Sequence, residues 1–149
     1  MLVLGVAAGV VWEQLADPAD WEVRETGIVL TEAASTGSFS VIVTFVAIGA
    51  VTSLILGCAL TLALRDLDWK LTPVLIVATL LAGVVAWQVG VLLGPPEPAT
   101  VRGLTVGDRV PSALAIDSAW PFLFWPMFGL AGLLGTAVLG STRELRPRS

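Results

Sequence analysis

The sequence predicts an all-α membrane protein, a four-helix transmembrane bundle with a small extracytoplasmic β-hairpin cap. Two observations predict this fold class. Of the 149 residues, 56% are hydrophobic and 13% are charged, whereas an average soluble domain has about 45–50% apolar and about 25% charged residues. Residues 33–64, 71–96 and 118–142 contain no charged side chain, and each run exceeds the roughly 20 apolar residues that a helix needs to cross a bilayer. These observations exclude an ordinary soluble domain.

The first helix is predicted over residues 2–16, where the chain is apolar as far as Trp12. It ends before Asp17-Pro18, because proline disfavours a helical conformation in the residue that precedes it. Such a helix is about 24 Å long, which is short for a hydrocarbon core of about 30 Å. The alternative is the apolar stretch of a signal peptide, but no basic residue precedes it and Glu13–Ala16 is a poor cleavage site. We therefore favour a short first transmembrane helix.

The first outer loop, residues 17–38, carries the clearest strand pattern of the chain. The β-prone stretches Trp21–Arg24 and Ile28–Thr31 flank Glu25-Thr26-Gly27, a three-residue turn with glycine at its end, which is typical of a β-hairpin. An isolated hairpin is only marginally stable in water. We therefore expect it to lie on the second outer loop or on the membrane surface.

The second and third helices are predicted to form an antiparallel pair. Ser38 is the expected N-cap of the second helix, residues 39–64. The inner loop 65–70 is short, so the third helix, residues 71–93, has to return alongside the second. It ends at Gly94-Pro95-Pro96, which stops a helix abruptly.

The second outer loop, residues 94–119, precedes the last helix. Within this loop Thr105–Val110 contains a Gly-Asp turn and is a candidate strand beside the hairpin. The fourth helix is predicted over residues 120–139 and ends at Gly140. Pro126 lies inside it and should kink it, because proline cannot donate the backbone hydrogen bond of a helix interior.

Basic residues predict which way the bundle faces. The membrane domain, residues 1–142, is followed by an Arg-rich tail, residues 143–149. More than half of the eight Lys and Arg residues lie in this tail and in the loop 65–70: Arg65, Lys70, Arg143, Arg146 and Arg148. Because Lys and Arg mark cytoplasmic loops, we expect a multi-pass protein of the plasma membrane with both termini in the cytoplasm and the acidic loops outside.

Small side chains recur at four-residue spacing in every predicted span, and we interpret them as helix-packing positions. Such spacing places them on one stripe of a helix, where they let two backbones approach closely. The stripes are Gly5 and Gly9; Gly49, Ser53 and Gly57; Ala78, Ala82, Ala86, Gly90 and Gly94; and Gly132, Thr136 and Gly140. They serve packing within the bundle or, alternatively, one stripe binds a partner helix. The third helix has the longest stripe and is expected to be central.

Candidates for chemistry are few. The chain has no histidine and a single cysteine, Cys58, which excludes histidine-based catalysis, the usual zinc sites and an intramolecular disulfide. We interpret Cys58 as a small side chain that faces lipid or a neighbouring helix. The sequence contains no glycine-rich phosphate loop, no nucleophile elbow and no set of residues with metal-ligand spacing. We therefore expect no enzyme activity, no catalytic residue, no cofactor, no metal and no nucleic-acid partner.

Two polar residues near the outer face offer an alternative function. A carboxyl group inside a membrane can couple the movement of protons or cations, and Glu13 lies near the end of the first helix. Gln88 is the one amide deep within a span. With these residues the chain would be a small secondary transporter or channel.

Tryptophans are interpreted as aromatic anchors at the membrane surfaces. Trp12, Trp87, Trp120 and Trp125 fall near the predicted outer face and Trp69 near the inner face.

In their order along the chain, these features resemble those of a family of actinobacterial four-span membrane proteins of unknown function. The resemblance rests on the short first helix ending at Trp12 and Pro18, the glycine-containing β-like segment before the helix that starts at Phe39, the stretch Ala86-Trp87-Gln88-Val89-Gly90-Val91-Leu92-Leu93-Gly94-Pro95, and Trp125-Pro126. It implies a four-span membrane protein and brings no catalytic residue with it.

The function that these patterns favour is that of an accessory or scaffold subunit of a membrane complex. Its surroundings would be the lipid bilayer, and its partner another membrane protein or a second copy of the chain. The prediction rests on the abundance of packing surface and the scarcity of reactive groups.

Overall fold

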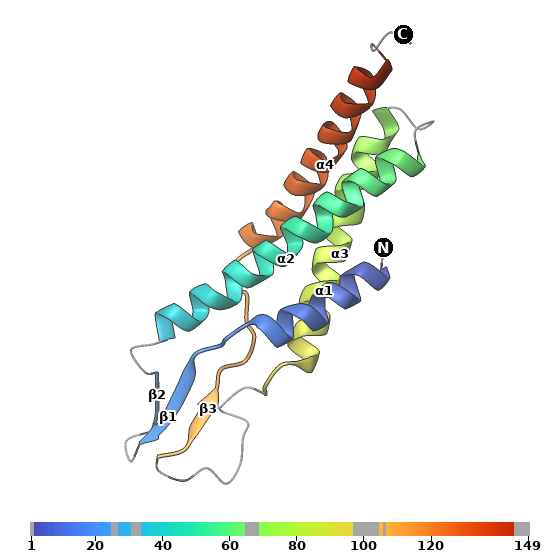
Figure 1. The fold of residues 1–149 in the computed structure, drawn as a ribbon. Coiled ribbons are helices and arrows are strands. Elements are labelled where there is room, and N and C mark those ends of the chain that lie inside the picture. Colours follow the sequence, from blue (N-terminus) through green and yellow to red (C-terminus); the bar gives the residue numbers. More distant parts are fainter. Residues whose placement is uncertain are drawn as a thin grey trace.

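The computed structural model of this protein describes residues 2–24, 27–30, 34–64, 69–96, 105 and 107–144. Over this part of the chain the structure is mostly helical, with three short strands at one end (Figure 1). The helices are α1 (Leu2–Leu15), α2 (Ala34–Ala63), α3 (Leu71–Leu93) and α4 (Trp120–Glu144), and the strands are β1 (Asp20–Arg24), β2 (Gly27–Leu30) and β3 (Arg109–Pro111).

Three of the four helices are long and apolar enough to cross a bilayer, which confirms the three long spans predicted. They cover Gly37–Ala63, Leu71–Leu93 and Trp120–Gly140. Helix α1 is apolar but has only 14 residues, which gives a length of about 21 Å. The architecture is that of a multi-pass membrane protein.

The four helices form two parallel pairs. Helices α1 and α3 run towards the sheet, whereas α2 and α4 run away from it (Figure 1). Helix α1 packs mainly on α3, and α2 packs mainly on α4, while α3 also contacts α4. The sheet therefore lies at one end of the bundle, and the end of α2, the start of α3 and the end of α4 lie at the other (Figure 1).

Two helix boundaries differ from the prediction. Helix α2 begins at Ala34 rather than at residue 39, so Ser38 is an exposed residue within the helix and not its N-cap. A tertiary contact explains the early start: a Cβ added to Gly37 would lie 2.6 Å from Ala19 Cα, so the first turn of α2 packs directly on the segment after α1.

Helix α4 continues past Gly140 to Glu144, into the segment predicted as a tail. A glycine inside a helix costs only about 1 kcal/mol relative to alanine, whereas backbone groups left without partners in lipid cost several kcal/mol each. Continuing the helix is therefore more favourable than ending it at Gly140. Pro126 lies inside α4, as predicted. The rest of the predicted tail, residues 145–149, lies outside the described residues.

The three strands form one antiparallel sheet in the order β2-β1-β3. Trp21 of β1 is opposite Leu30 of β2 on one side and Val110 of β3 on the other. Beyond β3, the Ser112 N–H donates to the Ala19 carbonyl oxygen at 2.7 Å. The structure thus has a small three-stranded sheet rather than a hairpin standing alone, and its role as a cap outside the membrane stays a prediction.

The details of the sheet also differ from the prediction. Gly27 pairs with Arg24 and belongs to β2 instead of to the turn, and the remaining turn residues, Glu25 and Thr26, lie outside the described part of the chain. Of the candidate strand Thr105–Val110, only the last residues pair, within Arg109–Pro111.

A short turn precedes β3. The backbone N–H and the hydroxyl of Thr105 donate to the Asp108 carboxylate at 2.8 and 2.9 Å. These hydrogen bonds, the backbone one first, lower the pKa of Asp108 because they favour its charged form. Gly107 has a φ of 98°, a conformation that glycine adopts without a steric cost.

Candidate functional site

The contact between α1 and α3 depends on two glycines of α1. A Cβ added to Gly5 would lie 2.9 Å from the Ala82 carbonyl oxygen, and one added to Gly9 would lie 2.8 Å from Val89 Cβ. Ala82 and Ala86 are buried in the core. The structure therefore brings the small residues of these two helices together, and a larger side chain at Gly5 or Gly9 would push the helices apart.

The contact between α2 and α4 uses small residues in the same way. Gly57 lies directly against the Gly129 carbonyl group, and a Cβ added to Gly132 would lie 3.2 Å from the Cys58 backbone nitrogen. The Cys58 thiol donates to the Gly132 carbonyl oxygen at 3.5 Å. Two of the packing positions predicted from the sequence, Gly57 and Gly132, thus lie at this helix contact.

Two other predicted packing glycines, Gly49 and Gly90, lie against tryptophan rings instead of against a helix backbone. Gly49 lies against the indole Nε1 of Trp125. On the opposite side, a Cβ added to Gly83 of α3 would lie 3.0 Å from Cδ2 of Trp125. Gly90 likewise lies against Trp12. A Cβ added to Gly90 would be 3.3 Å from Cδ2 of Trp12 and closer still to Cε3 and Cζ3 in the six-membered ring of the indole.

The interpretation of Trp12 and Trp125 as interface anchors is wrong, because both side chains are 0% exposed. They meet in an aromatic cluster around Phe45, whose ring centroid lies 5.1 Å from that of Trp12 and 5.5 Å from that of Trp125. The Trp12 Nε1–H donates to the Val41 carbonyl oxygen at 3.0 Å. By contrast, Trp120 is 50% exposed and Trp69 is 73% exposed, and their role as membrane-surface anchors stays a prediction.

The two predicted polar packing residues differ in burial. Ser53 is fully buried, and its hydroxyl has no hydrogen-bond partner among the described residues. Thr136 is partly exposed and donates to the Gly132 carbonyl oxygen of its own helix at 2.8 Å, so its hydroxyl is satisfied locally. Its neighbour Gly135 and the predicted stripe member Gly140 have open space around them.

The structure does not bring the two candidate transport residues into one cavity. Glu13 is half-buried beside Trp12 at the sheet end of α1, and Gln88 is exposed on α3. Gln88 lies two residues from both Ala86 and Gly90, and a helix turns about 100° per residue. Its side chain therefore leaves α3 on the face opposite the buried stripe. Across the part of the chain that the structure describes, no cluster of three His, Cys, Asp or Glu residues is suited to hold a metal.

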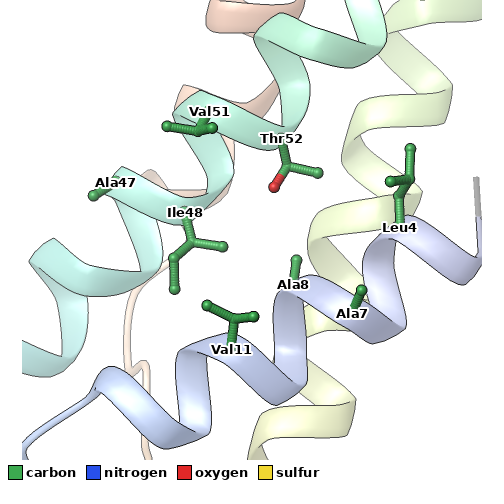
Figure 2. A pocket seen from close by; sticks show the side chains of 8 residues that line it. All are labelled: Leu4, Ala7, Ala8, Val11, Ala47, Ile48, Val51 and Thr52. Carbon is green, nitrogen blue, oxygen red and sulfur yellow. The ribbon is translucent and has the colours of Figure 1, made fainter.

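A groove lies between α1 and α2, which we call the α1/α2 groove (Figure 2). It has a volume of about 410 Å³ and opens to the surroundings. Its lining residues are Leu4, Ala7, Ala8 and Val11 from α1 and Ala47, Ile48, Val51 and Thr52 from α2. Thr52 is the single polar side chain among them, and its hydroxyl points into the space between the two helices.

The groove arises because α1 and α2 meet mainly near the sheet. There the Trp12 side chain reaches Val41, but further along the pair the facing side chains include Ala7, Ala8 and Ala47, which are too small to fill the space. The sequence pattern missed this groove, because only the Gly5–Gly9 stripe of α1 has regular small-residue spacing and that stripe faces α3.

Comparison of the chain with protein-family models, with curated proteins and with solved structures finds no match. The function therefore has to be argued from the groove, the helix contacts and the charges of the chain itself.

Proposed function

We propose that this protein is an accessory or scaffold subunit of a membrane complex, and that its α1/α2 groove holds one helix of a partner membrane protein. The observation that carries the proposal is the groove itself: an apolar hollow of about 410 Å³, open to the surroundings and lined by three alanines. Helices associate in membranes by close packing on small residues, since lipid offers no hydrophobic driving force between them.

The bundle already uses this kind of contact internally. The Trp125 ring lies between Gly49 and Gly83, and the Trp12 ring lies on Gly90. A partner helix that places a large apolar side chain between Ala7 and Ala47 would make an equivalent contact. The hydroxyl of Thr52, which points into the groove, could hydrogen-bond such a helix, a contact worth about 0.6 kcal/mol in membranes.

A helix-binding role is favoured over transport because neither candidate transport residue lines the groove. Glu13 and Gln88 are absent from its lining, and Gln88 is on the outer side of α3. A transport pathway places its ionisable and polar groups along a shared cavity. Within the described residues the groove instead offers contact surface and one hydroxyl.

The charge distribution supports a plasma-membrane orientation with both termini inside. Five of the eight Lys and Arg residues lie in the stretches 65–70 and 143–148, which adjoin the ends of α2, α3 and α4 away from the sheet (Figure 1). Basic residues remain on the cytoplasmic side during insertion. We therefore place the sheet outside the cell.

Site-specific photocrosslinking in living cells tests the helix-binding proposal. A photoreactive amino acid at Ala47, in the groove, should yield one adduct of defined mass with a membrane protein, whereas the same group at Ala137, exposed on α4, should not. In a second arm, Ala47→Trp fills the groove. We expect it to abolish stoichiometric co-purification of the crosslinked protein in mild detergent, with Ala137→Trp as the matched control.

Two results would contradict the proposal. The first is a photoreactive group at Ala47 that labels lipid alone. The second is an Ala47→Trp variant that retains its partner in the same amount as the Ala137→Trp control. Ala47 and Ala137 are both exposed, so neither substitution should disturb the bundle.

A further inference from the structure

A second hollow lies between α3 and the start of α4, at the sheet end of the bundle, and we call it the α3/α4 pocket. It has a volume of about 350 Å³, within the range of roughly 300–1,000 Å³ typical of small-molecule sites. Its apolar wall is formed by Val84 and Trp87 of α3, Ile116, and Phe122 of α4, and the carboxyl-bearing Asp117 lies beside them.

The apolar part of this pocket is rigidly built. The rings of Trp87 and Phe122 meet edge to face, with centroids 6.1 Å apart and an interplanar angle of 82°. Both residues and Ile116 also pack against the hydrophobic core of the bundle. The aromatic surface is therefore held in place before any ligand arrives, which reduces the entropy lost on binding.

Two residues that line the pocket carry a polar group without a partner among the described residues. The Trp87 indole Nε1–H is buried and has no acceptor among the described residues. A buried donor without an acceptor costs about 1–3 kcal/mol, so a ligand oxygen that reached this nitrogen would be favourable. Asp117 is exposed, and the structure pairs its carboxylate with no cation in the described part of the chain.

We propose that the α3/α4 pocket binds the head of a zwitterionic amphiphile, in which an ammonium group lies a few atoms from a phosphate or ester oxygen. The ammonium group would lie between the Asp117 carboxylate and the aromatic rings, as ammonium ligands do in aromatic sites. The oxygen would accept from Trp87 Nε1, and the apolar tail would follow Val84 and Ile116.

The composition of the pocket disfavours other ligands. One carboxylate is too few for a divalent cation, which takes several oxygen ligands. An amphiphile whose head carries only negative charge would be repelled by Asp117. The zwitterionic head satisfies the carboxylate and the buried indole donor together. It is available from two sources, a phospholipid of the bilayer or a free amphiphile.

Equilibrium binding of radiolabelled decylphosphocholine tests the proposal. The full chain is placed in nanodiscs of diglucosyl-diacylglycerol, a neutral lipid without an ammonium group, and binding to empty nanodiscs is subtracted. We expect one saturable site per chain. Asp117→Asn should weaken binding by about tenfold, whereas Asp17→Asn, at an exposed aspartate outside the pocket, should leave the affinity unchanged.

Two further probes separate the contributions of the polar groups. Decylphosphoglycerol keeps the phosphate but lacks the ammonium group, and it should bind about tenfold more weakly than decylphosphocholine. Trp87→Phe removes the indole donor. It should weaken the binding of decylphosphocholine more than the binding of decyltrimethylammonium, which has no acceptor oxygen. Circular dichroism establishes that each variant is folded.

The proposal is overturned if Asp117→Asn binds decylphosphocholine as tightly as the unaltered chain, or if decylphosphoglycerol binds equally well. Because Asp117 is exposed, this variant keeps its fold and the result can be interpreted. Adding phosphatidylethanolamine to the nanodiscs distinguishes the sources: displacement of the probe assigns the pocket to a lipid head, and undiminished binding assigns it to a free amphiphile.

Discussion

At the scale of single residues, two tryptophans and three glycines determine how closely the helices approach. The Trp12 and Trp125 side chains occupy the interior of the bundle because Gly90, Gly49 and Gly83 leave room for their rings. A large ring placed on glycine makes many dispersion contacts, which are the main attraction available between helices in lipid. These positions should therefore tolerate substitution less well than any exposed glycine of the same helices.

Gly90→Val tests this expectation. The added side chain would overlap the Trp12 ring, and forced overpacking typically costs 1–3 kcal/mol. We expect a clearly lower midpoint of thermal unfolding in mild detergent, followed by circular dichroism. The control is Gly135→Ala, which has open space around its position. It should leave the midpoint unchanged or raise it, because alanine is the better helix former. Equal midpoints for the two variants would refute the role assigned to Gly90.

The residue pattern predicted part of this packing and missed the rest. Four-residue spacing identified Gly57 and Gly132, whose own backbones lie at a helix contact. It could not show that Gly49 and Gly90 face indole rings, because a stripe on one helix does not identify the side chain that fills it. The position of Gln88 was available from the sequence: it lies halfway round the helix from Ala86 and Gly90, which excludes it from the same face.

At the scale of elements, α1 packs mainly on α3 and is attached to α2 through few contacts. Helix α1 is too short to span a hydrocarbon core of about 30 Å when it lies along the membrane normal. It also leaves the α1/α2 groove open along much of its length. Its attachment to α2 centres on Trp12, which donates to Val41 and contacts Phe45. The boundaries of α2 and α4 likewise depend on tertiary surroundings. The early start of α2 follows from the packing of Gly37 on Ala19, a contact that the local capping residues do not predict.

We expect Trp12→Phe to loosen α1 without unfolding the bundle. The variant loses the hydrogen bond to the Val41 carbonyl oxygen, which contributes about 1 kcal/mol. Faster amide hydrogen exchange should follow in α1, with little change in the α2–α4 pair. Trp120→Phe, at a half-exposed position, is the control and should exchange as the unaltered chain does. Exchange that accelerates equally in all four helices would show that Trp12 holds the whole bundle instead of one helix.

At the scale of the whole molecule, the two halves of the chain repeat one order of elements. A helix runs towards the sheet, strand residues follow, and a second helix runs away from it, first as α1, β1, β2 and α2 and again as α3, β3 and α4. Identical residues recur at one constant spacing between the halves: Gly5 and Gly83, Ala8 and Ala86, Leu15 and Leu93, Pro18 and Pro96, Leu56 and Leu134, Gly57 and Gly135, Ala59 and Ala137, and Arg65 and Arg143. The halves have the same direction, as in parallel repeats about an axis along the membrane normal.

This arrangement makes the orientation testable with two labelling sites. In a Cys58→Ala background, which removes the native thiol, we expect Asp108→Cys to react with a membrane-impermeant maleimide on intact cells. Lys70→Cys should react only after permeabilisation, because it directly precedes α3, which begins at the end of the bundle away from the sheet, and basic residues favour the cytoplasmic side. Both positions are exposed, so access to the thiol is limited by the membrane alone. The reverse pattern would invert the orientation and place the sheet and the α3/α4 pocket in the cytoplasm, while labelling of both sites on intact cells would contradict a spanning bundle.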